Sequence, residues 1–362
     1  MAASAERHMR AYVHDGKGGA ALADVPVPEP GPGEVRLAVR GCALNHFDLF
    51  VRQGLTGPGM REHRYPLVSG GDVAGEVEAL GEGITGVEVG DRVIVYPGLG
   101  CGTCDYCHRG EISMCRSYGI LGEQVWGGLA ECCVVLAANL LRVPATFDLR
   151  VGAAAPVPFT TGWRLLVSSG HLRAGETVLV VGVGGGVASA AMQIAVLAGA
   201  EVYVTSGEDW KIERARELGA VAGVNHRQRP FDEWAREVTQ GRGFDVVVDS
   251  TGQATWRSSI RSLSTGGRLC VCGATSGDRP DISIRELYQS HRQIVGAPLG
   301  GRADFDIAMG LVLSGRLRPV VHATYPLERV AEAFDELEAG KQFGKIVIEP
   351  GPAQGAARRS ER

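Results

Sequence analysis

Residues Glu176–Ala200, ETVLVVGVGGGVASAAMQIAVLAGA, decide the fold of this chain. The stretch opens with Thr177–Val181, an apolar, β-branched run typical of a buried parallel strand. A glycine-rich turn follows, and a helical segment, Val187–Leu197, then ends before Gly199. Strand, glycine turn and helix form the phosphate-binding unit of dinucleotide-binding folds, because backbone N–H groups approach a pyrophosphate at the helix N-terminus. The expected phosphate contacts are Gly182, Gly184, Gly185, Gly186 and Val187.

The residues on the C-terminal side of this unit continue the pattern. Three further segments read as strands and one as an amphipathic helix: Glu201–Thr205, Phe244–Asp249, Gly267–Cys272 and, for the helix, Lys211–Leu218. Glycine-rich turns also occur as plain connections. The alternation of strands with helices favours the cofactor interpretation and predicts an α/β fold with a doubly wound parallel sheet.

Composition sets the broad class. A length of 362 residues predicts two domains, and 44% hydrophobic with 22% charged residues is typical of a soluble globular protein. The net charge of −4 offers no basic footprint for nucleic acid, and no apolar run approaches the ~20 residues of a membrane helix. The start, MAASAERHMR, lacks the apolar core of a signal peptide, so we expect a cytoplasmic chain with reduced cysteines.

The chain changes character along its length. Residues 1–157 contain short strands broken by glycine turns, which predicts an irregular β-barrel domain. Residues 158–299 carry the dinucleotide-binding pattern, and we expect residues 300–350 to return to the first domain. The small, polar residues 351–362 are expected to be disordered.

Four cysteines within residues 98–117 have the spacing C-x2-C-x2-C-x7-C: Cys101, Cys104, Cys107 and Cys115. Four thiolates suit a tetrahedral zinc ion, and with no open position that ion is structural, one per chain. The alternatives are four unrelated buried cysteines or an iron–sulfur cluster. His108 is either a spare ligand or a loop residue. The remaining cysteines lie in strand-like runs and are expected to be small core residues: Cys42, Cys132, Cys133, Cys270 and Cys272.

The cysteine lobe followed by the glycine turn, together with three local phrases, resembles the medium-chain dehydrogenase/reductase superfamily. The phrases are ALNHFDLFVRQG (43–54), GDVAGEVEALGEGITGVEVGDRV (71–93) and FGKIVIEP (343–350). This superfamily includes zinc alcohol dehydrogenases and quinone oxidoreductases. The resemblance implies a GroES-like catalytic domain, a Rossmann domain and an active site in the cleft between them.

The chain departs from the zinc alcohol dehydrogenases at the catalytic metal. By resemblance, the first cysteine ligand falls on Asn45, the histidine on Gly71 with Asp72 in the place of the acid, and the second cysteine near Val157. These side chains do not replace two thiolates and an imidazole. We therefore expect a retained structural zinc, no catalytic zinc, and reduction of an activated C=C bond or quinone. Such a substrate delocalises negative charge and needs positioning, a hydrogen-bond donor and a proton, which water can supply.

The expected catalytic residues lie in LNHFDL. His46 takes a place where related enoyl reductases often have a tyrosine, and it would donate a proton, bind phosphate or simply pack. Asn45 would hold the nicotinamide amide or a substrate carbonyl, and Asp48 would be an orienting hydrogen-bond acceptor. Tyr65 and Trp126 either line the pocket or pack in the core, and packing is favoured.

The end of the second strand indicates the choice of cofactor. A small polar turn with Ser206 and Lys211 is similar to sites that accept a 2′-phosphate, and Arg227 would add charge. Glu208 and Asp209 oppose this interpretation if they turn inward. The sequence therefore favours NADPH over NADH.

The resemblance implies further cofactor contacts. Thr160 and Thr161 open a helix and are expected to face the nicotinamide, with helix capping as the alternative. Ser250, in the loop DSTG, and Gly273, in CGA, would pass under the nicotinamide half. Lys345 would be an additional cofactor contact.

Three functions remain open on these grounds. The first is an NADPH-dependent reductase without catalytic metal. The second is an alcohol or aldehyde dehydrogenase whose metal is held by His46, Asp48 and Asp72, and the third is a catalytically idle nucleotide-binding protein. The expected partners are a small-molecule substrate and a second copy of the chain, in a homodimer or homotetramer. The strand Arg268–Ala274 would supply a pairing edge.

Overall fold

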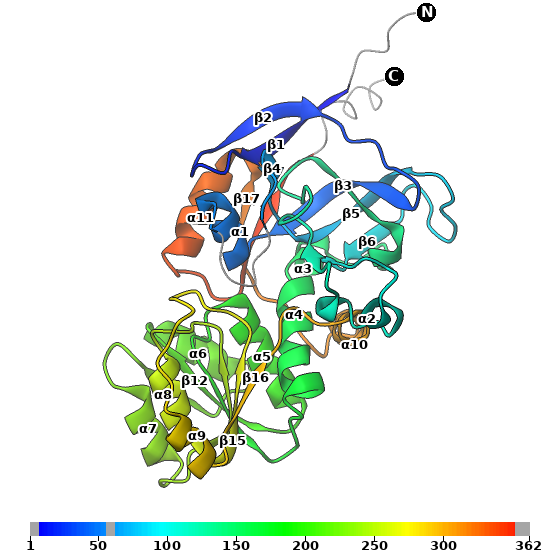
Figure 1. Ribbon diagram of the computed structural model, residues 1–362. Helices are drawn as coiled ribbons and strands as arrows, with labels where there is room; N and C mark the ends of the chain where they lie inside the picture. The colour runs from blue at the N-terminus through cyan, green and yellow to red at the C-terminus, as the bar shows by residue number, and fades with distance from the viewer. Residues whose placement is uncertain (1–6, 56–61, 352–362) are drawn as a thin grey trace, which may run out of the picture. The chain divides into compact units, whose positions relative to one another are not determined.

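The computed structural model describes residues 7–55 and 62–351 (Figure 1). It divides into two units, Met1–Pro156 with Val320–Arg362, and Val157–Pro319. The return to the first unit begins at Val320 rather than at residue 300, because the preceding helix belongs to the second unit. There, Arg164 Nη1 donates to Asp304 Oδ2 (3.2 Å), and Arg318 N donates to Gln193 Oε1 (2.9 Å). Of the expected disordered tail, residues 352–362 lie outside the described residues.

The first unit is built on antiparallel strands, as its glycine-broken sequence predicts. Its largest sheet has the order β10-β6-β5-β3-β18-β17, with β9 also paired to β3, and smaller sheets pair β2-β1-β4 and β7-β8. The strands are β1 (His8–His14), β2 (Ala20–Pro26), β3 (Glu34–Ala43), β4 (Leu67–Val68), β5 (Asp72–Leu80), β6 (Arg92–Val95), β7 (Gly98–Leu99), β8 (Gly119–Ile120), β9 (Cys132–Leu136), β10 (Leu140–Arg142), β17 (Val321–Pro326) and β18 (Lys345–Glu349). The helices are α1 (His46–Gln53), α2 (Asp105–His108), α3 (Leu149–Ala153) and α11 (Val330–Glu338).

Register places three strand ends of this unit together. Ala43, the last residue of β3, pairs with Asp72, the first residue of β5. It also pairs with Val347 of β18, and Leu44 N donates to Ile346 O (3.0 Å). The end of β3 and the starts of β5 and β18, which are far apart in sequence, therefore meet at one point of the sheet.

The second unit is a six-stranded parallel sheet with the order β13-β12-β11-β14-β15-β16, which confirms the doubly wound α/β fold. The strands are β11 (Thr177–Val180), β12 (Glu201–Ser206), β13 (Ala222–Asn225), β14 (Phe244–Asp249), β15 (Leu263–Val271) and β16 (Gln293–Gly296). The helices are α4 (Pro156–Trp163), α5 (Gly186–Leu197), α6 (Asp209–Glu217), α7 (Phe231–Val238), α8 (Trp256–Arg261), α9 (Ile284–Gln289) and α10 (Arg302–Leu313). Strand order reverses between β11 and β14, the point at which such sheets bind ligands.

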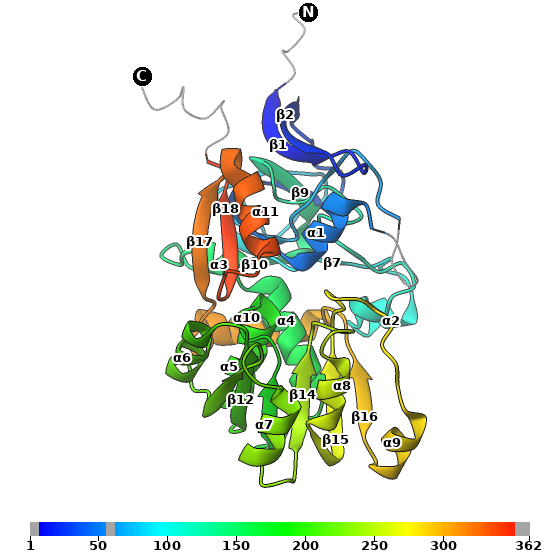
Figure 2. The same cartoon turned by 90° about the vertical axis from the view of Figure 1, so that its left-hand side faces the viewer.

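The prediction that the strand Arg268–Ala274 forms an edge of this sheet was wrong. β15 is paired on both sides, to β14 and to β16, so the strand around Arg268 is internal. The edge is β16, which Figure 2 shows at the end of the sheet beside α9. The sequence concealed this strand because it is only four residues long and largely exposed. Within the described residues, no helix is long and apolar enough to span a membrane.

Candidate active site

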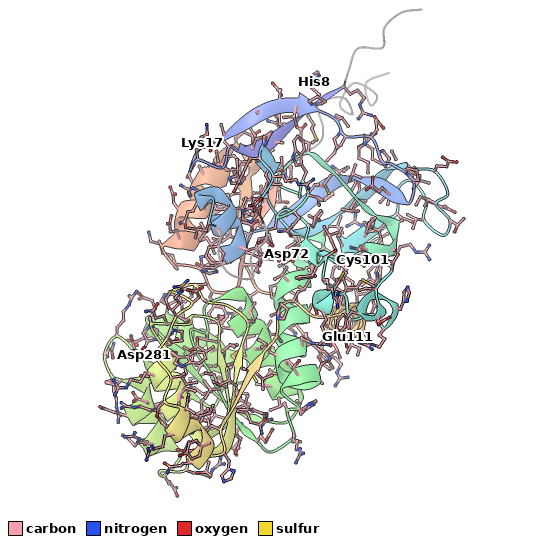
Figure 3. All side chains as sticks on the ribbon, in the orientation of Figure 1. His8, Lys17, Asp72, Cys101, Glu111 and Asp281 are labelled. Carbon is pink, nitrogen blue, oxygen red and sulfur yellow. The ribbon has the colours of Figure 1, made fainter. Side chains whose placement is uncertain are left out.

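The meeting point of β3, β5 and β18 holds a buried polar cluster. Lys345 Nζ donates to Asn45 Oδ1 (2.6 Å) and to Asp72 Oδ2 (2.9 Å). Asn45 Nδ2 donates to the same Asp72 oxygen (3.0 Å) and to Ala43 O (3.3 Å). The Asp72 side chain, labelled in Figure 3, is fully buried, and that of Lys345 is 5% exposed. A buried ion pair of this kind is tolerated only when such hydrogen bonds satisfy its remaining polar atoms.

Asp48 supports this cluster from the first turn of α1. Its carboxylate accepts the backbone N–H groups of Asn45 (2.7 Å) and Gly70 (2.8 Å), so the residue is the orienting acceptor that its position suggested. Complete burial raises the pKa of Asp48 to about 7, although both hydrogen bonds and the charge of Lys345 act in the opposite direction. Asp48 thus fixes the chain on both sides of the cluster.

His46 differs from its neighbours because its ring makes no hydrogen bond to any described residue. The side chain is half-buried. Burial, and secondarily the charge of Lys345, lowers the pKa of His46, which keeps the imidazole neutral near pH 7. The polar side-chain atoms of Asn45 and Asp48 are engaged within the protein, whereas the ring nitrogens of His46 remain available to a ligand.

Two of the expected contacts are engaged within the protein. Both amide hydrogens of Asn45 are donated, to Asp72 and Ala43, so this amide positions its neighbours. Lys345 is paired with Asp72 and Asn45, and its contact with the cofactor stays a prediction. The sequence did not reveal this pairing, because β18 lies about 300 residues from α1 in the chain.

The cluster does not suit the metal of zinc alcohol dehydrogenases. At Gly71, where the histidine would fall, an added Cβ would lie 2.6 Å from Leu121 O and 3.0 Å from Phe47 Cζ. No side chain fits there without moving the backbone. Among the described residues, the single group of ligand atoms spaced for a metal is the cysteine lobe.

The cysteine lobe fits zinc. The Sγ atoms of Cys101, Cys104, Cys107 and Cys115 all lie within 4.8 Å of one another, and those of Cys101 and Cys107 are 4.0 Å apart. Zn–S bonds of about 2.3 Å in a tetrahedron require sulfurs about 3.8 Å apart, whereas sulfurs on different irons of a cluster lie farther apart. Hydrogen bonds to Cys101 Sγ, of which the one from Thr103 N–H has the largest effect, lower the pKa of Cys101 to about 6. They favour the thiolate form that a metal needs.

The remaining cysteines and aromatic residues behave as packing groups. Four of the five other cysteines are buried and Cys272 is half-buried. Trp126 Nε1 donates to Pro66 O (3.0 Å), and Tyr65 donates to Val51 O (2.7 Å). Both aromatic side chains therefore hold the backbone in place. Trp126 also lines a cavity of the first unit, so its contact with a ligand stays open.

The glycine turn of the second unit has room for a ligand. Gly182 adopts φ 69°, a left-handed conformation that favours glycine, and its N–H donates to Thr205 Oγ1 (3.1 Å). Gly185, the N-cap of α5, has an ordinary φ of −74°, and an added Cβ would meet no protein atom closer than 3.6 Å. Neither backbone conformation nor packing explains glycine there. Open space in front of the N-terminus of α5 fits a pyrophosphate.

The loop at the carboxyl end of β14 adjoins this turn, since an added Cβ on Gly182 would lie 3.8 Å from Thr251 Oγ1, and the loop after β15 lies against it. An added Cβ on Gly273 would lie 2.9 Å from Ser250 O, so these two predicted contacts are neighbours. Asp249 opens the DSTG loop that the resemblance singled out, and its buried carboxylate accepts from Thr251 N (2.7 Å) and Ser259 Oγ (2.6 Å). The sequence did not reveal this supporting role. Asp249 fixes the loop that carries Ser250.

The end of β12 combines both signs of charge. Ser206 and Lys211 are buried, and burial lowers the pKa of Lys211. Arg227 pairs with Glu208, whereas Asp209 accepts from Asn225 Nδ2 (2.7 Å). The two acidic residues that oppose a 2′-phosphate are thus engaged by protein donors.

Thr160 and Thr161 lie inside α4 and are buried, so they do not cap its first turn. Thr160 Oγ1 has no hydrogen-bond partner in the described part of the chain. The structure thereby excludes the capping alternative.

This architecture, a parallel dinucleotide-binding sheet joined to a GroES-like β unit with a four-cysteine lobe, defines a class of nicotinamide-dependent oxidoreductases. Residues 31–145 match the family model described as alcohol dehydrogenase GroES-like domain, and residues 186–314 match that of zinc-binding dehydrogenase. The chain belongs to the zinc-type medium-chain dehydrogenase/reductase superfamily.

Relatives of this chain carry several activities. An acryloyl-coenzyme A reductase of Metallosphaera sedula is 35% identical, over 94% of this chain and 99% of its own length. A quinone oxidoreductase of Rattus norvegicus is 28% identical, over 90% of this chain and 92% of its own. The crystal structure of an NAD-dependent alcohol dehydrogenase superposes with a TM-score of 0.90 at 39% identity, covering 95% of this chain and 100% of that one. The chain is accordingly an NAD(P)H-dependent reductase or dehydrogenase.

Proposed function

We propose that this enzyme uses NADPH to reduce an activated C=C bond or a quinone, without a catalytic metal. The observation that carries the proposal is the Asn45–Asp72–Lys345 cluster, where the amide expected at the place of the first cysteine ligand is engaged by a buried ion pair. Gly71, which has no room for the histidine ligand, supports it. The acryloyl-coenzyme A reductase and quinone oxidoreductase relatives act on conjugated acceptors by name, which favours an enone, enoyl thioester or quinone as substrate.

In this proposal the glycine turn, His46 and the cysteine lobe each have a separate role. The backbone from Gly182 to Val187 would hold the pyrophosphate, and a bound reduced nicotinamide supplies hydride. The cluster fixes the loop that carries His46, whose neutral imidazole would relay a proton from water to the substrate, giving up its N–H proton as its other nitrogen takes one up. The four cysteines would hold one zinc ion, which braces the lobe because four protein ligands leave no open position.

The preference for NADPH rests on the end of β12. Lys211 and Ser206 would contact the 2′-phosphate, and Glu208 would keep Arg227 in place beside them. Lys211→Ala should weaken NADPH binding about tenfold and leave NADH binding almost unchanged, because only NADPH carries the 2′-phosphate. Titration of both nucleotides against the variant measures this. Equal losses for NADPH and NADH would contradict the preference.

The test of the reaction combines metal analysis with turnover. The purified chain should contain one zinc per chain, and it should oxidise NADPH with an enone, acryloyl-coenzyme A or a quinone after treatment with a chelator that leaves the lobe loaded. Two metals per chain, with alcohol oxidation lost on chelation, would favour the alcohol dehydrogenase alternative. NADPH binding with no turnover across the panel would favour an idle nucleotide-binding protein.

A further inference from the structure

We propose that Lys345 is the electrophilic catalyst of this site: its ammonium takes the place of a metal ion and donates a hydrogen bond to the substrate's carbonyl oxygen. Two of its three N–H groups are used, by Asn45 Oδ1 at 2.6 Å and Asp72 Oδ2 at 2.9 Å. Within the described residues, the third N–H has no acceptor. It remains for an oxygen that the protein does not supply.

The surroundings hold this ammonium in one place. Asn45 Nδ2 donates to Asp72 and Ala43, so its Oδ1 must turn toward Lys345, since the reversed amide would set an NH2 group against a cation. Asp48 in turn fixes the backbone of Asn45. A donor held rigidly in a buried site stabilises developing charge without reorganising, which is the property that a metal ion contributes elsewhere.

The charge appears during hydride addition. As a hydride from the reduced nicotinamide adds to the β-carbon of an enone or enoyl thioester, the C=C electron pair moves toward the carbonyl and leaves an enolate oxygen. The dinucleotide ends oxidised, and a proton from water, delivered directly or relayed by the His46 ring, then adds to the α-carbon and leaves hydroxide. Lys345 keeps its own protons throughout, and its N–H bond to the oxygen strengthens as the negative charge grows.

The first experiment measures thermal unfolding and does not depend on turnover. We compare Lys345→Met, Asp72→Asn and the double variant, with Lys341→Met as the control because that lysine is exposed and lies in the same return segment. If Lys345 is the counter-ion of Asp72, Lys345→Met removes the ammonium that pairs with this buried carboxylate, and adding Asp72→Asn should recover about 5 °C of its melting temperature. Recovery of folding counts likewise if Lys345→Met alone does not fold. A double variant no more stable than Lys345→Met overturns the pairing.

The second experiment rests on the proposed function. The kcat/KM of each variant is measured over a series of enones of increasing electron deficiency. Lys345→Met should lose about 100-fold on the poorest acceptor and about tenfold on the best, and Lys345→Arg should retain most of the activity. An equal loss on every acceptor means a structural role, and a loss confined to the KM for NADPH means a cofactor contact; either overturns the proposal. If wild type reduces none of the acceptors, the proposed function fails. The unfolding measurements, with Lys341→Met as the control, still decide whether Lys345 is the counter-ion of Asp72.

Discussion

The buried imidazole of His14 should make the first unit sensitive to acid. His14 ends β1 with no exposed surface, and its Nε2 lies 2.9 Å from Ser69 Oγ. Its Nδ1 has no partner among the described residues, and the rings of Tyr12 and Phe334 pack against it. Burial, and secondarily the charge of Arg52, lowers the pKa of His14 from 6.5 to about 4. Ser69 precedes Gly70, whose N–H binds Asp48, so His14 supports the active-site loop.

The magnitude follows from this pKa difference. An unfolded chain takes up the proton below pH 6.5, whereas the native His14 stays neutral until about pH 4. The stabilisation is therefore complete above pH 6.5 and is lost as the pH falls, by about 3 kcal/mol in full and about 2 kcal/mol between pH 7 and pH 5. The group that titrates is buried, so this free energy is not screened by solvent.

Urea denaturation at several pH values checks the prediction. Wild type should lose about 2 kcal/mol more unfolding free energy than His14→Gln on going from pH 7 to pH 5, because glutamine keeps a hydrogen bond to Ser69 but does not titrate. His171→Asn is the control, since His171 is exposed and its φ of 50° suits asparagine. If wild type and His14→Gln lose equal unfolding free energy over this range, the claim that the buried His14 imidazole stays neutral in the native protein is refuted.

Three further predictions concern other parts of the chain. Gly185→Val should weaken NADPH binding at least about tenfold with little change in melting temperature, because the added side chain meets only the ligand's space; a large loss of stability by calorimetry would contradict this. Cys104→Ser should abolish the zinc found by elemental analysis and lower the melting temperature without changing NADPH affinity. If the variant keeps one zinc per chain, the cysteine lobe is not the zinc site. We also propose that copies of the chain pair through the exposed edge β16, so Ile294→Lys should shift sedimentation toward monomer; unchanged sedimentation of an oligomer would exclude that edge.

Local sequence was sufficient for the regular part of this fold. The run from Thr177 to Leu197 carries its own strand, turn and helix signals within a few residues, and the structure has β11 and α5 at those positions. The cysteine lobe is equally local, since four ligands lie within one short segment and its spacing alone suggests tetrahedral zinc. The substitutions at Asn45 and Gly71 likewise appear in the sequence once the surrounding phrases are recognised.

Tertiary structure decided which side chains surround Asn45. Lys345 meets Asn45 and Asp72 only because β18 returns from the end of the chain to pair with β3, and no local pattern encodes a contact between residues so far apart. The same holds for the sheet edge, where the short β16 displaces the more regular β15 from the outer position. Sequence therefore determined which groups are present, whereas long-range strand pairing determined which of them are buried together and so which charges must compensate one another.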